Sequence, residues 1–290
     1  MRIVLLLATN IAVMVVASII FSVFGLDQFT EQYGIDYTGM LILCGLFGFG
    51  GAFVSLALSK WMAKRSTGAH VITQPRNEVE TWLVATVRRQ AEKAGIGMPE
   101  VAIYDSPEMN AFATGMNRNN ALVAVSTGLV RQMERREVEA VLAHEIGHVA
   151  NGDMVTLTLI QGVLNTFVMF FARIIGNFID RAILKNEGGP GIAYFVSVIV
   201  LQIVFGILAS FVVAWFSRQR EFRADHAGAS LEGRDAMVAA LARLKSSQQV
   251  SQQGTDLPKE IAAFGIRGTI GRLRATHPPL DDRIAALMRA

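Results

Sequence analysis

Residues 138–148 read Val-Glu-Ala-Val-Leu-Ala-His-Glu-Ile-Gly-His and end in the pattern H-E-x-x-H. His144 and His148 are four positions apart, so in a helix both imidazoles project from one face and can bind one metal ion. Glu145 stands beside them, where it can act on a water molecule rather than bind the metal. An apolar helix face precedes the motif: Val138, Val141 and Leu142. The stretch therefore predicts a helix that carries two zinc ligands and a general base. The alternative is a surface helix on which these side chains hold no metal.

A catalytic zinc ion takes three protein ligands and keeps one coordination position open. The chain has few other histidines: His70, His226 and His277. Glu221 and Asp225 are a better source, because they lie four residues apart and share one face of a helix. We predict that Glu221 is the third zinc ligand and that Asp225 orients one imidazole. The alternative for this segment is a solvated, mixed-charge flank of a membrane helix.

The composition indicates a membrane protein. Of the 290 residues, 52% are hydrophobic and only 18% are charged, against about 25% charged in an ordinary soluble domain. Four long apolar runs are present: Ile3 to Phe24, Met40 to Leu58, Met154 to Ala172 and Ile192 to Phe216. The length of each run is close to or above the roughly 20 residues that a helix needs to cross a bilayer. We expect an α-helical integral membrane protein with four hydrophobic helices. The alternatives are a cleaved signal peptide for the first run and a buried helical hairpin for the last two.

The distribution of charge predicts the orientation. Residues 26–38, between the first two runs, contain three acidic side chains and no Lys or Arg, whereas basic residues follow the second and fourth runs. Positive flanks stay in the cytoplasm, so both termini and residues 60–153 are expected there. Two crossings between His148 and Glu221 return the chain to the same side, which predicts a zinc site close to the membrane surface. The net charge of +3, without a basic stripe, predicts no nucleic-acid partner.

The less hydrophobic segments predict a mixed α and β domain. Five elements are expected: a helix over 77–94, strands over 101–104 and 122–125, a helix from 134 onward and another over 235–244. The two short strands are expected to form a small antiparallel sheet. The Ser/Gln-rich residues 246–255 are expected to form a loop. Cys44 is the single cysteine, so no disulfide forms within the chain.

These motifs resemble those of the HtpX family, which are bacterial membrane-bound zinc endopeptidases of the gluzincin class. The resemblance covers nearly the whole length and includes H-E-x-x-H followed by E-x-x-x-D. Further matching segments are Asn110–Gly115, Val125–Leu129 and His277-Pro278-Pro279 followed by Arg283. The resemblance implies a gluzincin-like α+β metallopeptidase domain in two parts. Residues 1–65 would form two transmembrane helices, 66–153 and 217–290 the two parts of the cytosolic catalytic domain, and 154–216 the hairpin between them.

The resemblance also implies a function and further site residues. The expected function is cleavage of misfolded or damaged membrane proteins on the cytosolic side of the bacterial inner membrane, a role in stress response and protein quality control. Asn110, Ala111 and Phe112 match the cleft edge, where a polypeptide substrate would pair as an added strand; the alternative is a turn. His277 matches a position that helps to stabilise the oxyanion, and Arg283 is a further expected catalytic residue nearby; the alternative is a helix-capping His-Pro turn and a surface arginine.

Two other classes of protein compete with the enzyme. The first is a membrane scaffold or chaperone with a structural zinc, although structural sites usually close with four protein ligands, often cysteines. The second is a small-solute transporter, which requires ionisable groups along a pathway through its spans; Arg173 alone supports it. In the enzyme, Glu145 would take the proton of the attacking water and pass it to the leaving amine.

Overall fold

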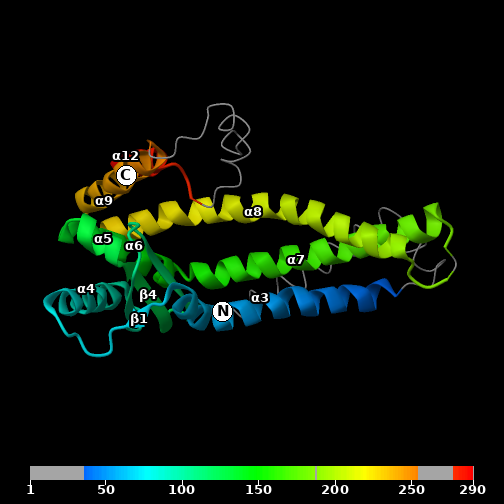
Figure 1. The fold of residues 1–290 in the computed structure, drawn as a ribbon, viewed down its shortest axis with the longest axis horizontal. Helices are drawn as coiled ribbons and strands as arrows, with labels where there is room; N and C mark the ends of the chain where they lie inside the picture. The colour runs from blue at the N-terminus through cyan, green and yellow to red at the C-terminus, as the bar shows by residue number, and fades with distance from the viewer. Residues whose placement is uncertain (1–35, 187, 254–276, 290) are drawn as a thin grey trace. The chain divides into compact units, whose positions relative to one another are not determined.

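The computed structural model describes residues 36–186, 188–253 and 277–289 (Figure 1). The chain divides into two compact units. One comprises residues 1–55 and 158–213, and the other comprises residues 56–157 and 214–290. The first predicted membrane run, Ile3 to Phe24, lies outside the described residues.

Three of the described helices are long and apolar enough to cross a membrane. They are α3 (Tyr37–Thr67), α7 (Asp153–Phe178, extended by the π-helical turn η1 at Ile179–Ile183) and α8 (Ile192–Glu232). They contain the second, third and fourth predicted runs, so the expectation of an α-helical membrane protein is confirmed. All three are longer than the runs. The C-terminal ends of α3 and α8 continue as helix into the second unit, whereas α7 continues past Ala172 within the first unit.

Small residues bring α3 and α7 together in the first unit. A Cβ atom on Gly48 would lie 2.4 Å from Thr166 Oγ1, and one on Gly162 would lie 2.8 Å from the ring of Phe49. Such close approach of helix backbones is typical of packing within membranes. Many large apolar side chains of α8 are exposed instead, among them Ile199, Ile203 and Leu208, as expected of a helix that contacts lipid.

The second unit contains a four-stranded sheet with the order β1-β2-β4-β3. Its strands are β1 (His70–Val71), β2 (Glu100–Tyr104), β3 (Ala111–Asn117) and β4 (Asn120–Ser126). The two predicted strands, now β2 and β4, are neighbours but run parallel, so the predicted antiparallel pairing is wrong. The cause is β3, which reverses the chain direction between them and pairs antiparallel with β4 at the edge of the sheet. Sequence analysis missed β3 because Ala, Gly and Asn, which it contains, are poor strand formers.

Five helices complete this unit: α4 (Glu78–Ala94), α5 (Thr127–Gln132), α6 (Arg135–Asn151), α9 (Arg234–Gln253) and α12 (Leu280–Arg289). Helices α4, α5 and α6 contact the sheet, whereas α9 packs on α6 and α12 packs on α9. The core lies between the sheet and the helices and includes Val123, Leu142, Leu241 and Leu287. The predicted helices over 77–94 and from 134 are present. The predicted loop over 246–255 is wrong for residues 246–253, which continue α9. No Gly or Pro interrupts the helix before Gly254, and Gln is a good helix former.

Candidate active site

Helix α6 carries the H-E-x-x-H motif and buries its apolar side in the core. Its first turn is held by Glu137, whose carboxylate accepts the backbone N–H of Glu134 at 2.9 Å. Val138, Leu142 and Ile146 are at most 1% exposed, so the helix cannot rotate without exposing them. This fixed orientation directs His144 and His148 to the opposite side, toward the C-terminal part of α8, while Glu145 lines a cleft.

Small residues allow α8 to approach the motif closely. A Cβ atom on Gly147 would lie 2.9 Å from the Cβ of Ala227, and one on Gly228 would lie 3.2 Å from the backbone nitrogen of His144. Residues 221, 224, 225 and 228 of α8 are all buried, and their spacing of three and four places them on one face. The close contact between these two helices explains how Glu221 reaches the histidines.

His144, His148 and Glu221 meet and form a group that can hold a metal ion. One side-chain donor atom from each lies within 4.8 Å of those from the other two. The Nε2 atom of His144 is 3.6 Å from Oε2 of Glu221, and Nε2 of His148 is 3.3 Å from Oε1. Both imidazoles therefore present the same nitrogen to the same carboxylate.

The other nitrogen of each imidazole contacts a separate carboxylate. Nδ1 of His144 is 2.9 Å from Asp225 Oδ1, as the E-x-x-x-D spacing led us to expect. Nδ1 of His148 is 2.7 Å from Asp153 Oδ2. Asp153 was not among the predicted site residues. The one feature of the sequence that could have indicated it is an acidic residue directly after Gly152, at the end of the zinc-motif helix.

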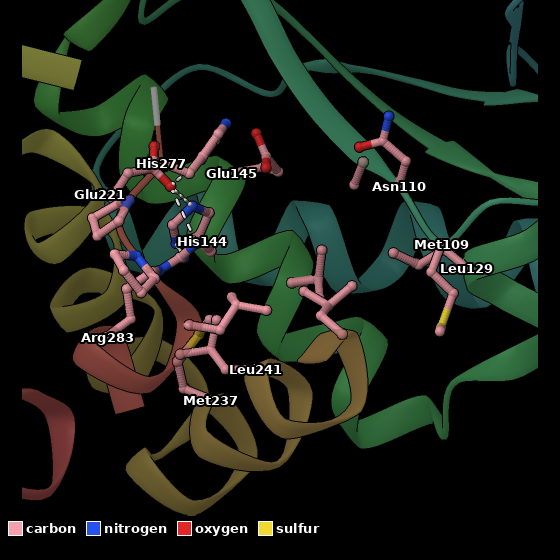
Figure 2. A pocket seen from close by; sticks show the side chains of 16 residues that line it. Met109, Asn110, Leu129, His144, Glu145, Glu221, Met237, Leu241, His277 and Arg283 are labelled. Carbon is pink, nitrogen blue, oxygen red and sulfur yellow. Dashed lines mark hydrogen bonds and ion pairs between the residues drawn. The ribbon is translucent and has the colours of Figure 1, made fainter. Parts of the chain in front are cut away.

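Arg283 and His277 also lie at this site. Arg283 of α12 is 6% exposed and donates two hydrogen bonds to Asp225, at 2.8 and 2.6 Å; its Nη1 atom is 3.3 Å from Glu221 Oε2. The alternative of a surface arginine is therefore wrong. His277 precedes α12, and its Nδ1 lies 2.8 Å from the same oxygen of Glu221, while its side chain is 62% exposed. Figure 2 shows Glu221, His277 and His144 grouped together, with dashed lines for contacts at this site.

These contacts determine the charges at the site. Burial by itself would raise the pKa of Glu221, but the adjoining imidazoles of His144 and His148 outweigh it and hold that pKa far below its ordinary value. Burial would likewise lower the pKa of His148, but Asp153 and then Glu221 outweigh it and raise the pKa to about 9. The pKa of Asp225 is lowered despite burial, chiefly by Arg283. The carboxylates are thus anionic, and they attract positive charge.

The buried carboxylate of Glu221 fits a metal ion. Its side chain is completely buried, and its Oε1 atom has no hydrogen-bond partner in the described part of the chain. Its nearest partner is Nε2 of His148, at 3.3 Å. An anionic oxygen buried this deeply is stable only beside positive charge, which an imidazolium or a metal ion can supply. Two imidazole nitrogens and one carboxylate oxygen are also the donor set of a known class of catalytic zinc site.

A cleft of about 620 Å³ opens beside this group. His144, Glu145, Glu221, His277 and Arg283 line one part of it, and Met109, Asn110 and Ala111 line another (Figure 2). Much of the remaining lining is apolar: Leu129, Val141, Met237, Leu241, Leu244 and Leu280. Phe112 is not among the lining residues and packs beside Tyr104, with ring centroids 5.7 Å apart. Residues 111–117 form a strand, so the alternative of a turn is wrong.

A half-buried glutamate beside two histidines, facing a cleft next to an edge strand, defines the class of protein as a metalloprotease. Comparison with known proteins agrees. The model of peptidase family M48 matches residues 77–290. Protease HtpX of Stenotrophomonas maltophilia is 60% identical over 289 residues, covering 99% of this chain and 97% of the relative. Protease HtpX of Pseudomonas aeruginosa is 60% identical over 291 residues, covering 99% and 98%.

The chain belongs to the HtpX family of M48 metallopeptidases, as its resemblance to that family implied. A third relative, the HtpX homolog of Nitrosomonas europaea, is 58% identical over 294 residues, covering 100% of this chain and 99% of the relative. Among solved structures, S. mikatae Ste24p is similar with a TM-score of 0.62 and 16% identity. The match covers 98% of this chain and 67% of Ste24p, and at this identity it supports the fold alone.

Proposed function

We propose that this membrane metalloprotease is a zinc endopeptidase that cleaves misfolded or damaged membrane proteins on the cytosolic side of the bacterial inner membrane. The observation that carries the proposal is the buried group of His144, His148 and Glu221, with Glu145 lining the same cleft. All four are the residues that the motifs predict for such an enzyme.

In this proposal His144, His148 and Glu221 bind one zinc ion. Zinc held there supplies a Lewis acid, which polarises the scissile carbonyl and makes the attacking water more acidic. The structural-zinc alternative requires a fourth protein ligand. Within residues 36–186, 188–253 and 277–289, the group that can hold a metal contains three, which favours the catalytic site.

Glu145 is the proposed general base. It adjoins His144 in the chain and lines the cleft, but it does not belong to the group that can hold the metal. Its carboxylate is therefore available to take the proton of the water as the water attacks the peptide carbonyl. The same carboxyl group then delivers the proton to the leaving amine.

His277 and Arg283 are proposed to act in different ways. His277 is largely exposed and lines the cleft. With Nδ1 on Glu221, its imidazolium form can donate a hydrogen bond from Nε2 to the oxyanion that forms on the substrate. Arg283 is buried and makes its hydrogen bonds to Asp225. We therefore assign Arg283 to holding Asp225 and keeping Glu221 anionic, rather than to contact with the substrate.

The outer edge of β3 is the proposed place for the substrate backbone. Among the described strands, β3 is paired only with β4. The N–H of Ser126 donates to the carbonyl of Asn110, and hydrogen-bonded pairs alternate along an antiparallel ladder. Ala111 and Ala113 therefore direct their N–H and C=O groups away from β4. A peptide added as a strand would pair with these groups, while Phe112 supports the strand from the face away from the cleft.

The proposed location follows from the charged flanks of the spans. Lys60, Lys64 and Arg65 follow the second apolar run, and Arg218 and Arg220 follow the fourth, which favours cytoplasmic ends for both. The catalytic unit continues from these ends. Protease protection of the chain in vesicles of known sidedness tests this orientation. Cleavage of the catalytic unit from the periplasmic side would contradict it.

The central test compares detergent-purified wild type with Glu145→Gln. We expect both to contain about one zinc per chain, because all three proposed ligands remain, and we expect the variant to lose about 10²- to 10⁴-fold in peptide hydrolysis. Glu139→Gln is a matched control on the same helix, since Glu139 accepts a hydrogen bond from Trp82 at 2.8 Å and does not line the cleft. Its rate should stay near wild type. Hydrolysis at the wild-type rate by Glu145→Gln would reject the mechanism.

The substrate class requires a separate measurement. A purified membrane protein is offered to the enzyme in its folded form and after denaturation in detergent. Faster cleavage of the denatured form is expected, because pairing with the edge of β3 needs an extended and accessible backbone. Equal rates for both forms would contradict the quality-control role while leaving the peptidase activity intact.

A further inference from the structure

The second imidazole of the motif has a carboxylate partner beyond the end of its own helix. Asp153 Oδ2 lies 2.7 Å from Nδ1 of His148. The carboxylate is 2% exposed, so this contact is shielded from water and from dissolved salt. A charge buried to this degree is stable only when it is paired.

The turn at Gly152 brings Asp153 to this position. Gly152 adopts a left-handed conformation with φ of 66°, and its N–H bonds to the carbonyls of His148 and Val149. This ends α6 in the last turn of the motif, and Asp153 becomes the first residue of α7. The break in the helix at Gly152 allows a side chain that is five residues from His148 to contact the Nδ1 side of its ring.

The two histidines are thus held in the same way. Asp225 contacts Nδ1 of His144 at 2.9 Å, and Asp153 contacts Nδ1 of His148 at 2.7 Å. In each case the remaining nitrogen, Nε2, faces Glu221. A carboxylate at Nδ1 keeps the ring proton on that atom and leaves the Nε2 lone pair for a metal.

We propose that Asp153 is a positioning residue for His148, the counterpart of Asp225 for His144; this rests on the proposed zinc site. Asp153 fixes the tautomer and the rotation of the imidazole. One further consequence follows from its place in the chain. Helices α7 and α8 connect the zinc-motif helix to the third proposed ligand. The first residue of α7, Asp153, supplies one carboxylate to the site, and the C-terminal part of α8 supplies two, Glu221 and Asp225.

A purely structural role is the competing explanation. An acidic residue in the first turn of a helix is favourable on its own, and Asp153 Oδ1 also lies 3.5 Å from Nη2 of Arg223. That ion pair is long, and the side chain of Arg223 is 62% exposed, so it contributes little. Neither feature explains why the second oxygen of Asp153 contacts the histidine.

The test measures Zn²⁺ affinity of the detergent-purified full chain by competition with a chromophoric chelator. Asp153→Ala should bind Zn²⁺ about 10- to 100-fold more weakly than wild type. Asp153→Asn should lose less, since its amide oxygen can still accept the Nδ1 proton without the charge. The absorption bands of bound Co²⁺ should change in both variants, because the ring of His148 is less firmly held.

Two control variants separate positioning from helix stability. Asp235→Asn removes an exposed first-turn acid from α9, and Arg223→Gln removes the exposed ion pair; both should keep wild-type Zn²⁺ affinity. If the Asp153 variants melt at lower temperature yet bind Zn²⁺ and Co²⁺ as wild type does, Asp153 only stabilises the N-terminus of α7, and the proposed positioning role is wrong. If His144→Ala also binds Zn²⁺ as wild type does, the zinc site itself is wrong.

Discussion

The two sides of the cleft are built from different parts of the chain and in different ways. On the metal side, α6, α8 and α12 bring together charged side chains that are almost completely buried, including Glu221 at 0%, Asp225 at 1% and Arg283 at 6% exposure. On the strand side, β3 offers backbone groups and small side chains at an open edge. The metal side is held by a closed network of charges, whereas on the strand side β3 has, among the described strands, no partner on its outer edge, where we propose that the substrate pairs.

This difference predicts which properties each side controls. A change on the metal side leaves a buried charge unpaired and should affect metal binding and every substrate alike. A change on the strand side should affect how well a peptide is held, and should leave the metal in place. The four experiments below test that division, beginning with the largest effect.

Glu221→Ala should have the largest effect. Loss of a direct ligand should weaken Zn²⁺ binding by more than the 10- to 100-fold typical of an outer partner, and hydrolysis should fall with it. Glu232→Ala is a matched control, because Glu232 lies on the same helix and pairs with Arg89 at 2.8 Å. Chelator competition and a peptide assay measure both. If Glu221→Ala binds Zn²⁺ with wild-type affinity, Glu221 is not a zinc ligand.

Zinc affinity should also depend strongly on pH. The pKa of His148 in the metal-free protein is raised to about 9, so below pH 9 a zinc ion must displace its proton. Affinity should therefore fall as pH decreases, by about tenfold per pH unit for this proton, or about 100-fold between pH 9 and 7. Chelator competition at several pH values measures the slope. An affinity independent of pH over this range would show that His148 releases no proton to the metal.

The same raised pKa affects the stability of the metal-free protein in a defined direction. The folded state binds the His148 proton more tightly than the unfolded state, whose pKa is near 6.5. The stabilisation is therefore fully present below about pH 6.5 and is lost as pH rises through 9. Thermal melting with a chelator present should follow this trend, and addition of zinc should reduce it.

The smallest effect is expected on the strand side. Ala113→Pro removes an N–H that points away from β4, and proline is tolerated on edge strands. The loss of one hydrogen bond to a substrate should lower kcat/KM about 3- to 10-fold through KM, with Zn²⁺ affinity unchanged. Thr114→Pro is the paired control, because its N–H points toward β4; it should destabilise the sheet. Equal behaviour of the two variants would contradict the proposed register of β3.

Much of the metal side could be predicted from sequence because its spacing is local. His144 and His148, and likewise Glu221 and Asp225, lie one helical turn apart, and helical spacing is visible in the sequence. Asp153 was missed because its contact depends on the left-handed turn at Gly152, and an acidic residue at a helix start has an ordinary explanation.

The strand side was predicted less well, for a physical reason. The role of Asn110 to Phe112 came from resemblance to the family, since the Ala- and Gly-containing strand β3 has weak strand propensity. Because β3 was not recognised, β2 and β4 were expected to be antiparallel, although they pair parallel. Strand pairing depends on contacts between distant residues, which propensity does not encode.

By itself the sequence determined the membrane helices, the motif helix and the residue types of a metalloprotease site, because hydrophobic length and helical periodicity are properties of short segments. Only the tertiary structure decided that Gly147 and Gly228 admit α8 against α6, that Arg283 is buried on Asp225, and that Asp153 holds His148. Those contacts join residues from different elements, and their geometry follows from how closely the helices pack.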